Sequence, residues 1–158
     1  MTAFQPPEQL PAGIGIEDFH CGDKIVDDWV RTHSASARKR GTAVIYVVRC
    51  GSAIAGFYSL SRHAVARTEV RGGWFTRNAP EHVPAVLLGM LGVDERFKGL
   101  GLGASLLRDA IQNTMKVAHL AGAKVLIVDP TGTEAASFYE HFGFVHLPGT
   151  NRMALKLI

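Results

Sequence analysis

The spacing of apolar residues along the chain alternates between a helical and a strand period. The first helical stripe lies within residues 22–34, and Asp23 is its predicted N-cap. The stripe is formed by Ile25, Val26, Trp29 and Val30. Residues 36–41 carry no such stripe, and we expect them to form a loop.

A hairpin is predicted next. Residues 42–50 and 53–61 are rich in β-branched and aromatic residues, and only Gly51 and Ser52 separate them. Two such runs joined by a two-residue turn that contains glycine are typical of an antiparallel hairpin. After an irregular stretch, residues 85–94 form a short, continuous apolar run, which indicates a central strand buried on both faces.

The second half of the chain alternates helix and strand. A helical stripe covers residues 102–121 and stops at Gly122, a natural C-terminal residue for a helix. Residues 123–128 form another buried strand. A short helix follows, opened by a capping-box pattern over residues 131–134, and residues 153–158 are the last strand.

These elements predict one domain over residues 1–158 with a mixed α/β sandwich fold. Residues 1–13, rich in proline and glycine, are expected to be a loosely held arm without the features of a signal peptide. No apolar run is long enough to span a bilayer. Cys21 and Cys50 fit neither a metal-binding nor a disulfide spacing, so we expect a cytoplasmic protein with reduced thiols and no metal.

Charge is distributed unevenly along the chain. The formal net charge is only +3 at pH 7, yet residues 31–78 hold nine Lys or Arg against one acidic residue. Such asymmetry indicates a surface that meets a polyanion. The alternative is a solvated basic face with no ligand, because strand-like segments interrupt the run and can point the charges in different directions.

Three glycines alternate at positions 99, 101 and 103, between the apolar run of residues 85–94 and the next helix. Glycines at such a joint let backbone N–H groups at a helix N-terminus approach phosphate oxygens. The chain has no Gly-Lys-Ser/Thr, which excludes a P-loop. A dinucleotide-binding loop is disfavoured, because about 90 residues precede these glycines and no acid follows at the required distance.

The glycine stretch resembles the (Q/R)-x-x-G-x-(G/A) motif of the GNAT superfamily of acyl-CoA N-acyltransferases. Arg96–Gly101 fits the motif fully, whereas Lys98–Gly103 has Lys at its first position and is favoured by the helix that follows. The segments LLGMLGVDERFKGLGLGASLLRDAI and EAASFYEHFGF resemble two consecutive blocks of that family. The resemblance covers about residues 85–145. It implies a central mixed sheet whose splayed strand pair holds acetyl-CoA, with helices on both faces.

A closer resemblance covers most of the chain. FHCGDKIVDDWV, GTAVIYVV, GFYSL, VPAVLLGMLGVD and FYEHFGF resemble, in that order, segments of the small GNAT toxins of bacterial toxin–antitoxin pairs. These toxins acetylate the amino group of aminoacyl-tRNA and stop translation. The resemblance implies aminoacyl-tRNA as substrate, a small antitoxin protein as partner, and a homodimer.

The resemblance also implies the donor site. Backbone groups of Leu91 and Val93, with Gly92 between them, should pair with the pantetheine arm and the thioester carbonyl of acetyl-CoA. Backbone N–H groups of the following loop should hold its pyrophosphate. These loop residues are Lys98, Gly99, Leu100, Gly101, Leu102, Gly103 and Ala104. The alternative is a glycine-rich joint without a ligand, although three alternating glycines have no evident packing purpose.

Tyr139 matches the tyrosine of the family's F-Y block and is the candidate general acid. A phenol with a pKa near 10 is protonated at pH 7 and can donate to a departing thiolate. The alternative is a core tyrosine beside the apolar stripe of Ala135, Phe138 and Phe142.

No side chain is identified as the general base. An α-amine has a pKa near 8, so a useful share of it is neutral at pH 7, which weakly favours an α-amine over a lysine acceptor. The candidates by residue type alone are His63, His82, His119 and His141.

The basic segment is expected to bind tRNA phosphates. The contacts predicted from the sequence, chosen because they lie in loop-like stretches, are Arg38, Lys39, Arg40, Arg71 and Arg77. Trp74 and Phe75 either stack on a terminal base or pack a flap over the core. Two other functions stay open: a GNAT enzyme for a small amine or a protein N-terminus, and a nucleotide- or nucleic-acid-binding module without catalysis.

Overall fold

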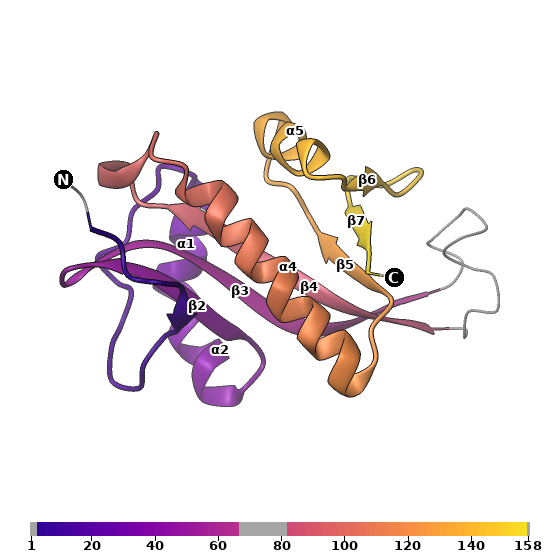
Figure 1. Cartoon of the computed structure of the whole chain (residues 1–158), viewed down its shortest axis with the longest axis horizontal. Coiled ribbons are helices and arrows are strands. Elements are labelled where there is room, and N and C mark those ends of the chain that lie inside the picture. The colour runs from indigo at the N-terminus through magenta and orange to yellow at the C-terminus, as the bar shows by residue number, and fades with distance from the viewer. Residues whose placement is uncertain (1–2, 67–81, 158) are drawn as a thin grey trace. The chain divides into compact units, whose positions relative to one another are not determined.

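The computed structural model describes residues 3–66 and 82–157. The chain divides into two compact units, of which unit 1 is Met1–Ser61 with Gly89–Ala110 and unit 2 is Arg62–Leu88 with Ile111–Ile158. Strands β3 (Ala53–Ala66) and β4 (His82–Val93) and helix α4 (Leu102–Ala121), which are labelled in Figure 1, each contribute residues to both units.

The strands hydrogen-bond in the order β1-β2-β3-β4-β5-β7-β6. β1 (Glu8–Gln9), β2 (Val44–Cys50) and β3 pair antiparallel, as do β5 (Val125–Val128), β7 (Met153–Lys156) and β6 (Val145–His146). β4 and β5 are parallel, as a strand–helix–strand crossover requires. The mixed α/β fold predicted from the sequence is thereby confirmed.

The predicted hairpin and first helix are both present in unit 1. β2 and β3 flank a turn at Gly51 and Ser52. Helix α1 (Lys24–Thr32) has the predicted N-cap, because the Asp23 carboxylate accepts a hydrogen bond from Ile25 N–H at 3.0 Å. Capping of this kind stabilises a helix by about 1 kcal/mol.

Two sequence-based predictions in unit 1 are wrong. The segment 36–41 is not a loop: a second helix, α2 (Ser34–Arg40), follows α1 directly and ends at Gly41, whose φ is 69°. The N-terminal arm is not loose over its described part, since Gln5 N–H and Leu10 N–H each donate to a β2 carbonyl at 2.8 Å. Leu10 is also buried, so backbone pairing and apolar burial together hold the arm on β2.

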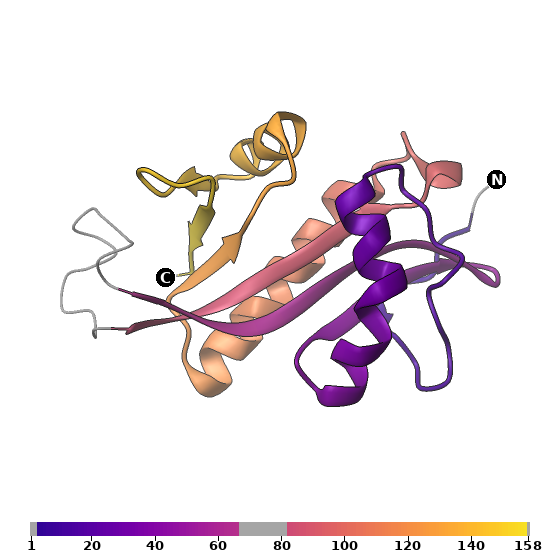
Figure 2. The ribbon, with the colours of Figure 1, turned by 180° about the vertical axis from the view of Figure 1, so that it is seen from behind.

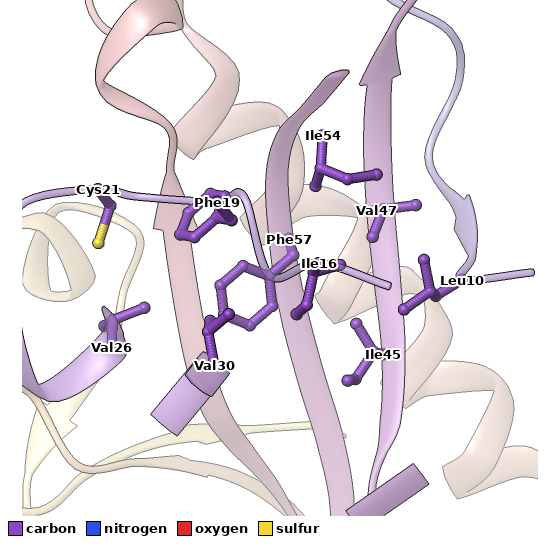
Figure 3. Packing of buried hydrophobic residues seen from close by; sticks show 10 residues of the cluster. All are labelled: Leu10, Ile16, Phe19, Cys21, Val26, Val30, Ile45, Val47, Ile54 and Phe57. Atoms are coloured by element: carbon purple, nitrogen blue, oxygen red, sulfur yellow. The ribbon is translucent and has the colours of Figure 1, made fainter. Parts of the chain in front are cut away.

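The core of unit 1 lies between the α1–α2 pair and the strands. Figure 2 shows α1 and α2 in front of β2 and β3. Figure 3 shows ten side chains of this core: Leu10, Ile16, Phe19, Cys21, Val26, Val30, Ile45, Val47, Ile54 and Phe57. Phe57 is its centre, with Phe19 at 4.9 Å edge-on and Trp29 stacked at 6.0 Å. Each such aromatic stabilises the fold by about 1.5–3 kcal/mol through burial.

Unit 2 carries the second half of the predicted alternation. Helix α4 ends before Gly122, whose φ is 85°, and β5 follows. Helix α5 (Thr133–His141) begins at Gly132 as N-cap, one residue after Thr131, where the capping-box pattern was predicted to start. The two-residue strand β6 was not predicted. The buried cluster of this unit comprises Val65, Val83, Ala85, Val125, Ile127, Leu147 and Ala154.

Among the residues that the structure describes, no helix is both long enough and apolar enough to cross a membrane.

Candidate active site

The C-terminal part of β4 extends beyond its parallel neighbour. β5 ends at Val128, which pairs with Leu88, whereas β4 continues through residues 89–93. The register of the parallel pair therefore stops where the resemblance places the splayed strands. Residues 91–93, within this stretch, are the ones whose backbone groups are predicted to bind the donor.

The direction of those backbone groups follows from strand geometry. Successive residues of a strand direct their N–H and C=O groups to opposite edges. Met90 N–H donates to a β3 hydroxyl at 3.0 Å, and Asp94 N–H donates to a β3 carbonyl at 2.8 Å. Leu91 and Val93 therefore direct their polar backbone groups away from β3, the orientation that a backbone site for pantetheine needs.

Two glycines of β4 are required by packing. A Cβ on Gly92 would lie 3.0 Å from the Phe19 ring and 3.2 Å from a methyl group of Val26, so the core of unit 1 packs directly on the strand. Gly92 shares the orientation of Met90 and turns its carbonyl toward β3, which gives it a structural role beside its predicted donor contact. A Cβ on Gly89 would lie 2.9 Å from Ser59 Oγ.

The glycine loop joins β4 to α4 through a short 3₁₀ helix, η1 (Glu95–Phe97). Gly99 and Gly101 have φ values of 79° and 82°, which favour glycine, and no heavy atom lies within 4 Å of where their Cβ atoms would be. Open space on one side of a backbone with this conformation lets an anion approach its N–H groups. Gly103 lies inside the first turn of α4.

The N-terminus of α4 supplies donors for an anion. Ser105 N–H donates to the Gly101 carbonyl at 3.2 Å. The N–H groups of Leu102, Gly103 and Ala104 precede this bond, so helix geometry offers them no acceptor within the helix. The helix dipole adds positive potential at the same place. Leu102 is buried, which fixes the turn to the core, whereas Leu100 is half exposed. The predicted loop residues thus fit a pyrophosphate.

The two cations of the motif are engaged with protein groups. The Lys98 ammonium donates to the Cys21 carbonyl at 2.5 Å. Arg96 donates to both carboxylate oxygens of Asp94, at 2.8 and 3.2 Å. In this structure, therefore, neither side chain points freely into the loop, and the donors toward an anion are backbone groups.

Asp94 is a buried carboxylate that sequence reasoning missed. It also accepts the backbone N–H groups of His20, at 3.2 Å, and Arg96, at 3.0 Å. Burial by itself raises the pKa of Asp94, but the hydrogen bonds from Arg96 and from the His20 N–H, with the charge of Arg96, outweigh it and lower the pKa below its ordinary value. A charged, fully bonded carboxylate thus stands at the start of the loop.

Tyr139 lies on α5 in unit 2 and is 6% exposed. The rings of Phe138 and Phe144 contact it edge-on, at centroid distances of 5.3 and 5.4 Å. Phe138 and Phe142 of the predicted apolar stripe are only half-buried, so Tyr139 is the more enclosed ring. Aromatic packing of this kind holds a phenol in one orientation, and the catalytic role of Tyr139 stays a prediction.

Of the histidine candidates for a general base, one is engaged with another side chain and the others are exposed. The Arg152 guanidinium lies 2.9 Å from His63 Nε2 and is held in turn by Asp129, at 2.8 and 3.0 Å. Because a guanidinium only donates, His63 Nε2 accepts this bond and is not available to take a proton there. The remaining candidates, His82, His119 and His141, are exposed.

The predicted tRNA contacts fall into two groups. Lys39 and Arg40 are exposed on α2. Arg38 instead donates to the carbonyls of residues 10, 11 and 14, at 3.3, 3.0 and 2.9 Å, and so fastens the N-terminal arm to α2. The other predicted residues, Arg71, Trp74, Phe75 and Arg77, lie outside the part of the chain that the structure describes.

Comparison with known proteins shows the family to which the chain belongs. The model of the "Acetyltransferase (GNAT) domain" matches residues 41–146. A curated protein, the tRNA-acetylating toxin of Mycobacterium tuberculosis, is 32% identical over 158 residues, which cover 100% of this chain and 94% of that protein. The chain therefore belongs to the GNAT acetyltransferases, which confirms the resemblance and the enzyme class predicted from the sequence.

Two solved structures confirm the fold at lower identity. AtaT complexed with acetyl-methionyl-tRNAfMet has a TM-score of 0.86 and 22% identity, covering 98% of this chain and 95% of that one. A Tyr-to-Phe mutant of the AtaT toxin, bound to the C-terminus of the antitoxin AtaR and to acetyl-CoA, has a TM-score of 0.81 and 22% identity, covering 98% and 94%.

Proposed function

We propose that this protein is a toxin that transfers the acetyl group of acetyl-CoA to the α-amino group of an aminoacyl-tRNA and thereby blocks translation. The observation that carries the proposal is the end-to-end similarity, at 32% identity, to a protein named tRNA-acetylating toxin. The geometry of the loop after β4 is consistent with the donor half of that reaction.

The donor half uses backbone groups. Acetyl-CoA supplies a thioester, and the amine attacks its carbonyl carbon. In the proposal, Leu91 and Val93 pair with the pantetheine arm and the thioester carbonyl, which polarises that carbonyl. The N–H groups of residues 98–104, with the dipole of α4, hold the pyrophosphate. Side-chain identity matters little at these positions, whereas backbone position matters greatly.

Tyr139 serves the leaving group. As the C–N bond forms and the C–S bond breaks, the sulfur takes up negative charge, and the Tyr139 phenol donates a proton to it. The amine proton passes to solvent, and solvent returns a proton to the Tyr139 phenolate, which restores the general acid. No dedicated base is required, because an α-amine with a pKa near 8 is neutral in a useful share of molecules at pH 7.

The acceptor half relies on charge. Lys39 and Arg40 are exposed cations on α2, and contacts of such residues with phosphates supply most of the affinity for tRNA. Arg71 and Arg77 belong to the same basic segment. Because aminoacyl-tRNA is the substrate, we place the protein in the cytoplasm, with a small antitoxin as its partner and a homodimer as its assembly.

The decisive experiment offers labelled acetyl-CoA to three acceptors: charged total tRNA, the same tRNA after deacylation, and a mixture of small amines and N-terminal peptides. We expect label on charged tRNA only. Label on the amines or peptides would identify the alternative GNAT enzyme. Binding of nucleic acid without any transfer would contradict catalysis altogether.

Charge reversal sharpens the choice of acceptor. Lys39→Glu with Arg40→Glu should lower the rate with charged tRNA at least tenfold and weaken its dependence on salt, because two phosphate contacts are lost. Lys116→Glu, an exposed cation of α4 outside the basic segment, is the matched control. Equal rates in the two variants would contradict the assignment of α2 to tRNA.

A further inference from the structure

The residues His20–Gly22, which precede α1, are bound at three points to the residues that lead into the glycine loop. Asp94 Oδ2 accepts the His20 N–H at 3.2 Å, and Glu95 N–H donates to the His20 carbonyl at 3.0 Å. Lys98 then donates its ammonium to the Cys21 carbonyl at 2.5 Å. The contacts join positions more than seventy residues apart in the sequence.

The other side of the same segment is held by α1. The Asp27 carboxylate accepts Cys21 N–H at 2.9 Å with one oxygen and Gly22 N–H at 3.0 Å with the other. His20 Nδ1 lies 3.0 Å from Asp27 Oδ2. Asp27 is 3% exposed, so these bonds replace its hydration. His20–Gly22 is therefore a strut between α1 and the start of the glycine loop.

Both carboxylates are charged while buried. Burial raises the pKa of Asp27, yet the backbone and side-chain hydrogen bonds of Cys21, the Gly22 N–H and the nearby His20 together lower it below its ordinary value. Asp94 behaves in the same way. Buried carboxylates with several donors allow little freedom of position, because any shift leaves a charge or a donor unpaired.

The glycine loop needs such a fixed point. Gly99 and Gly101 have open space where a side chain would be, so no packing against them restrains the loop. A backbone site binds well only when its N–H groups are held in place before the ligand arrives. Lys98, directly before the first of these glycines, is the last residue that the strut holds.

We propose that Asp27, Asp94 and Lys98 are positioning residues, which fix the donor-binding loop through the His20–Gly22 strut. This inference rests on the proposed function of the loop as the pyrophosphate site of acetyl-CoA. It gives Lys98 a task different from direct contact with phosphate: its ammonium fastens the loop to the Cys21 carbonyl. Asp27, on α1, thus influences donor binding without touching the donor.

A double-mutant cycle on coenzyme A affinity tests the proposal. Asp27→Asn replaces one accepting oxygen by an amide that cannot accept, and Lys98→Met removes the ammonium. Each single variant should raise the Kd for coenzyme A about five- to twentyfold. The double variant should raise it by much less than the product of the two, because both act through one strut. Asp28→Asn, an exposed acid on the same helix that pairs with Lys24, is the matched control and should leave the Kd unchanged.

Two further readouts separate positioning from other roles. Acetylated pantetheine, which lacks the pyrophosphate, should bind the wild type and all variants alike. In the ligand-free protein, Lys98→Met should raise amide hydrogen exchange at residues 99–104 at least fivefold. The hydrogen-exchange measurement on Lys98→Met tests the positioning role even if Asp27→Asn fails to fold.

Three results would overturn the inference: multiplicative effects in the cycle, an unchanged Kd in Asp27→Asn, or wild-type exchange at residues 99–104 in Lys98→Met. Failure of the wild-type protein to bind acetyl-CoA would overturn the proposed function itself, and with it this inference.

Discussion

The glycine loop of unit 1 and Tyr139 of unit 2 are held in place in different ways. The loop offers backbone groups, and polar contacts from Asp27, Asp94 and Lys98 hold the residues around it. Tyr139 offers one side-chain oxygen, and the rings of neighbouring aromatic residues hold it.

This difference follows from what each group must do. A backbone donor has no rotamer, so only the path of the chain sets its position, and hydrogen bonds to distant segments define that path. A phenol on a helix needs only its ring plane and its χ angles fixed, which apolar contact accomplishes. Charge-dependent conditions should therefore affect the loop, and packing changes should affect Tyr139.

The largest effect is expected from Tyr139→Phe. Loss of the proton donor should lower kcat by about 100- to 10,000-fold, the usual contribution of general acid catalysis. The Kd for acetyl-CoA, measured by calorimetry, should change less than twofold. Tyr46→Phe, a half-buried tyrosine of β2 stacked on Tyr58, is the control and should keep full activity. An active Tyr139→Phe protein would assign that tyrosine to the core alone.

The strut should also protect Cys21 from alkylation. Burial, together with the hydrogen bond and charge of Asp27, raises the pKa of the Cys21 thiol to about 11 from an ordinary 9.0. Its thiolate fraction at pH 8 is therefore about 100-fold lower than usual. In a Cys50→Ser variant, iodoacetamide should modify Cys21 correspondingly slowly, with full reactivity restored in urea. Equal rates in native and unfolded protein would show that the strut is not formed.

A smaller effect is expected from Gly101→Ala. Both Gly101 and Gly149 have positive φ, 82° and 75°, and open space at the Cβ position. Alanine costs about 1–2 kcal/mol in that conformation at either place. Both variants should therefore lose similar stability, whereas only Gly101→Ala should raise the Kd for acetyl-CoA, by about tenfold. Similar affinities in the two variants would remove the loop from the donor site.

The smallest effect concerns acid stability. The folded pKa values of Asp27 and Asp94 lie below their unfolded value of about 3.9, so the unfolded state binds protons first as pH falls. Their contribution is complete above that value and is lost as pH falls through the folded pKa values. Urea titrations between pH 6 and pH 2 should show the free energy of unfolding falling below about pH 4.

Two variants compare the loss of stability in acid, which depends on the buried carboxylates, with a change in the aromatic packing around Tyr139. Asp27→Asn should flatten the decline, because one of the two titrating groups is gone. Phe144→Leu should lower the free energy of unfolding by about 1–2 kcal/mol at every pH and leave the slope unchanged. An unchanged slope in Asp27→Asn would contradict the charged state of that carboxylate.

Most elements could be predicted from local patterns. The hairpin, the central strand, α4 and the stop at Gly122 each follow from apolar spacing or from glycine placement within one segment. Helix α2 could not, because it is seven residues long, has no apolar stripe, and is held by Arg38 through carbonyls of the N-terminal arm. Arg38 consequently differs from its exposed neighbours Lys39 and Arg40.

The residues of the site divide in the same way, into those that a local pattern predicts and those that it does not. Gly99, Gly101 and Tyr139 were predicted as site residues from short motifs, since each motif is local and its residue types are specific. Asp27 and Asp94 were missed, because an acid within an amphipathic helix or after a strand usually faces water. The one local signal for Asp27 was its place next to Val26, a residue of the apolar stripe that is buried.

By itself, the amino-acid sequence determined the order of helices and strands, the glycine joint and the family, because these depend on residue types within reach of one another along the chain. Only the tertiary structure decided that the backbone polar groups of Leu91 and Val93 point away from β3. It also decided that Arg38 and Lys98 donate to backbone carbonyls and that the carboxylates of Asp27 and Asp94 are buried. The physical reason is that hydrogen-bond partners and burial depend on segments far apart in sequence, and composition carries no record of which segments meet.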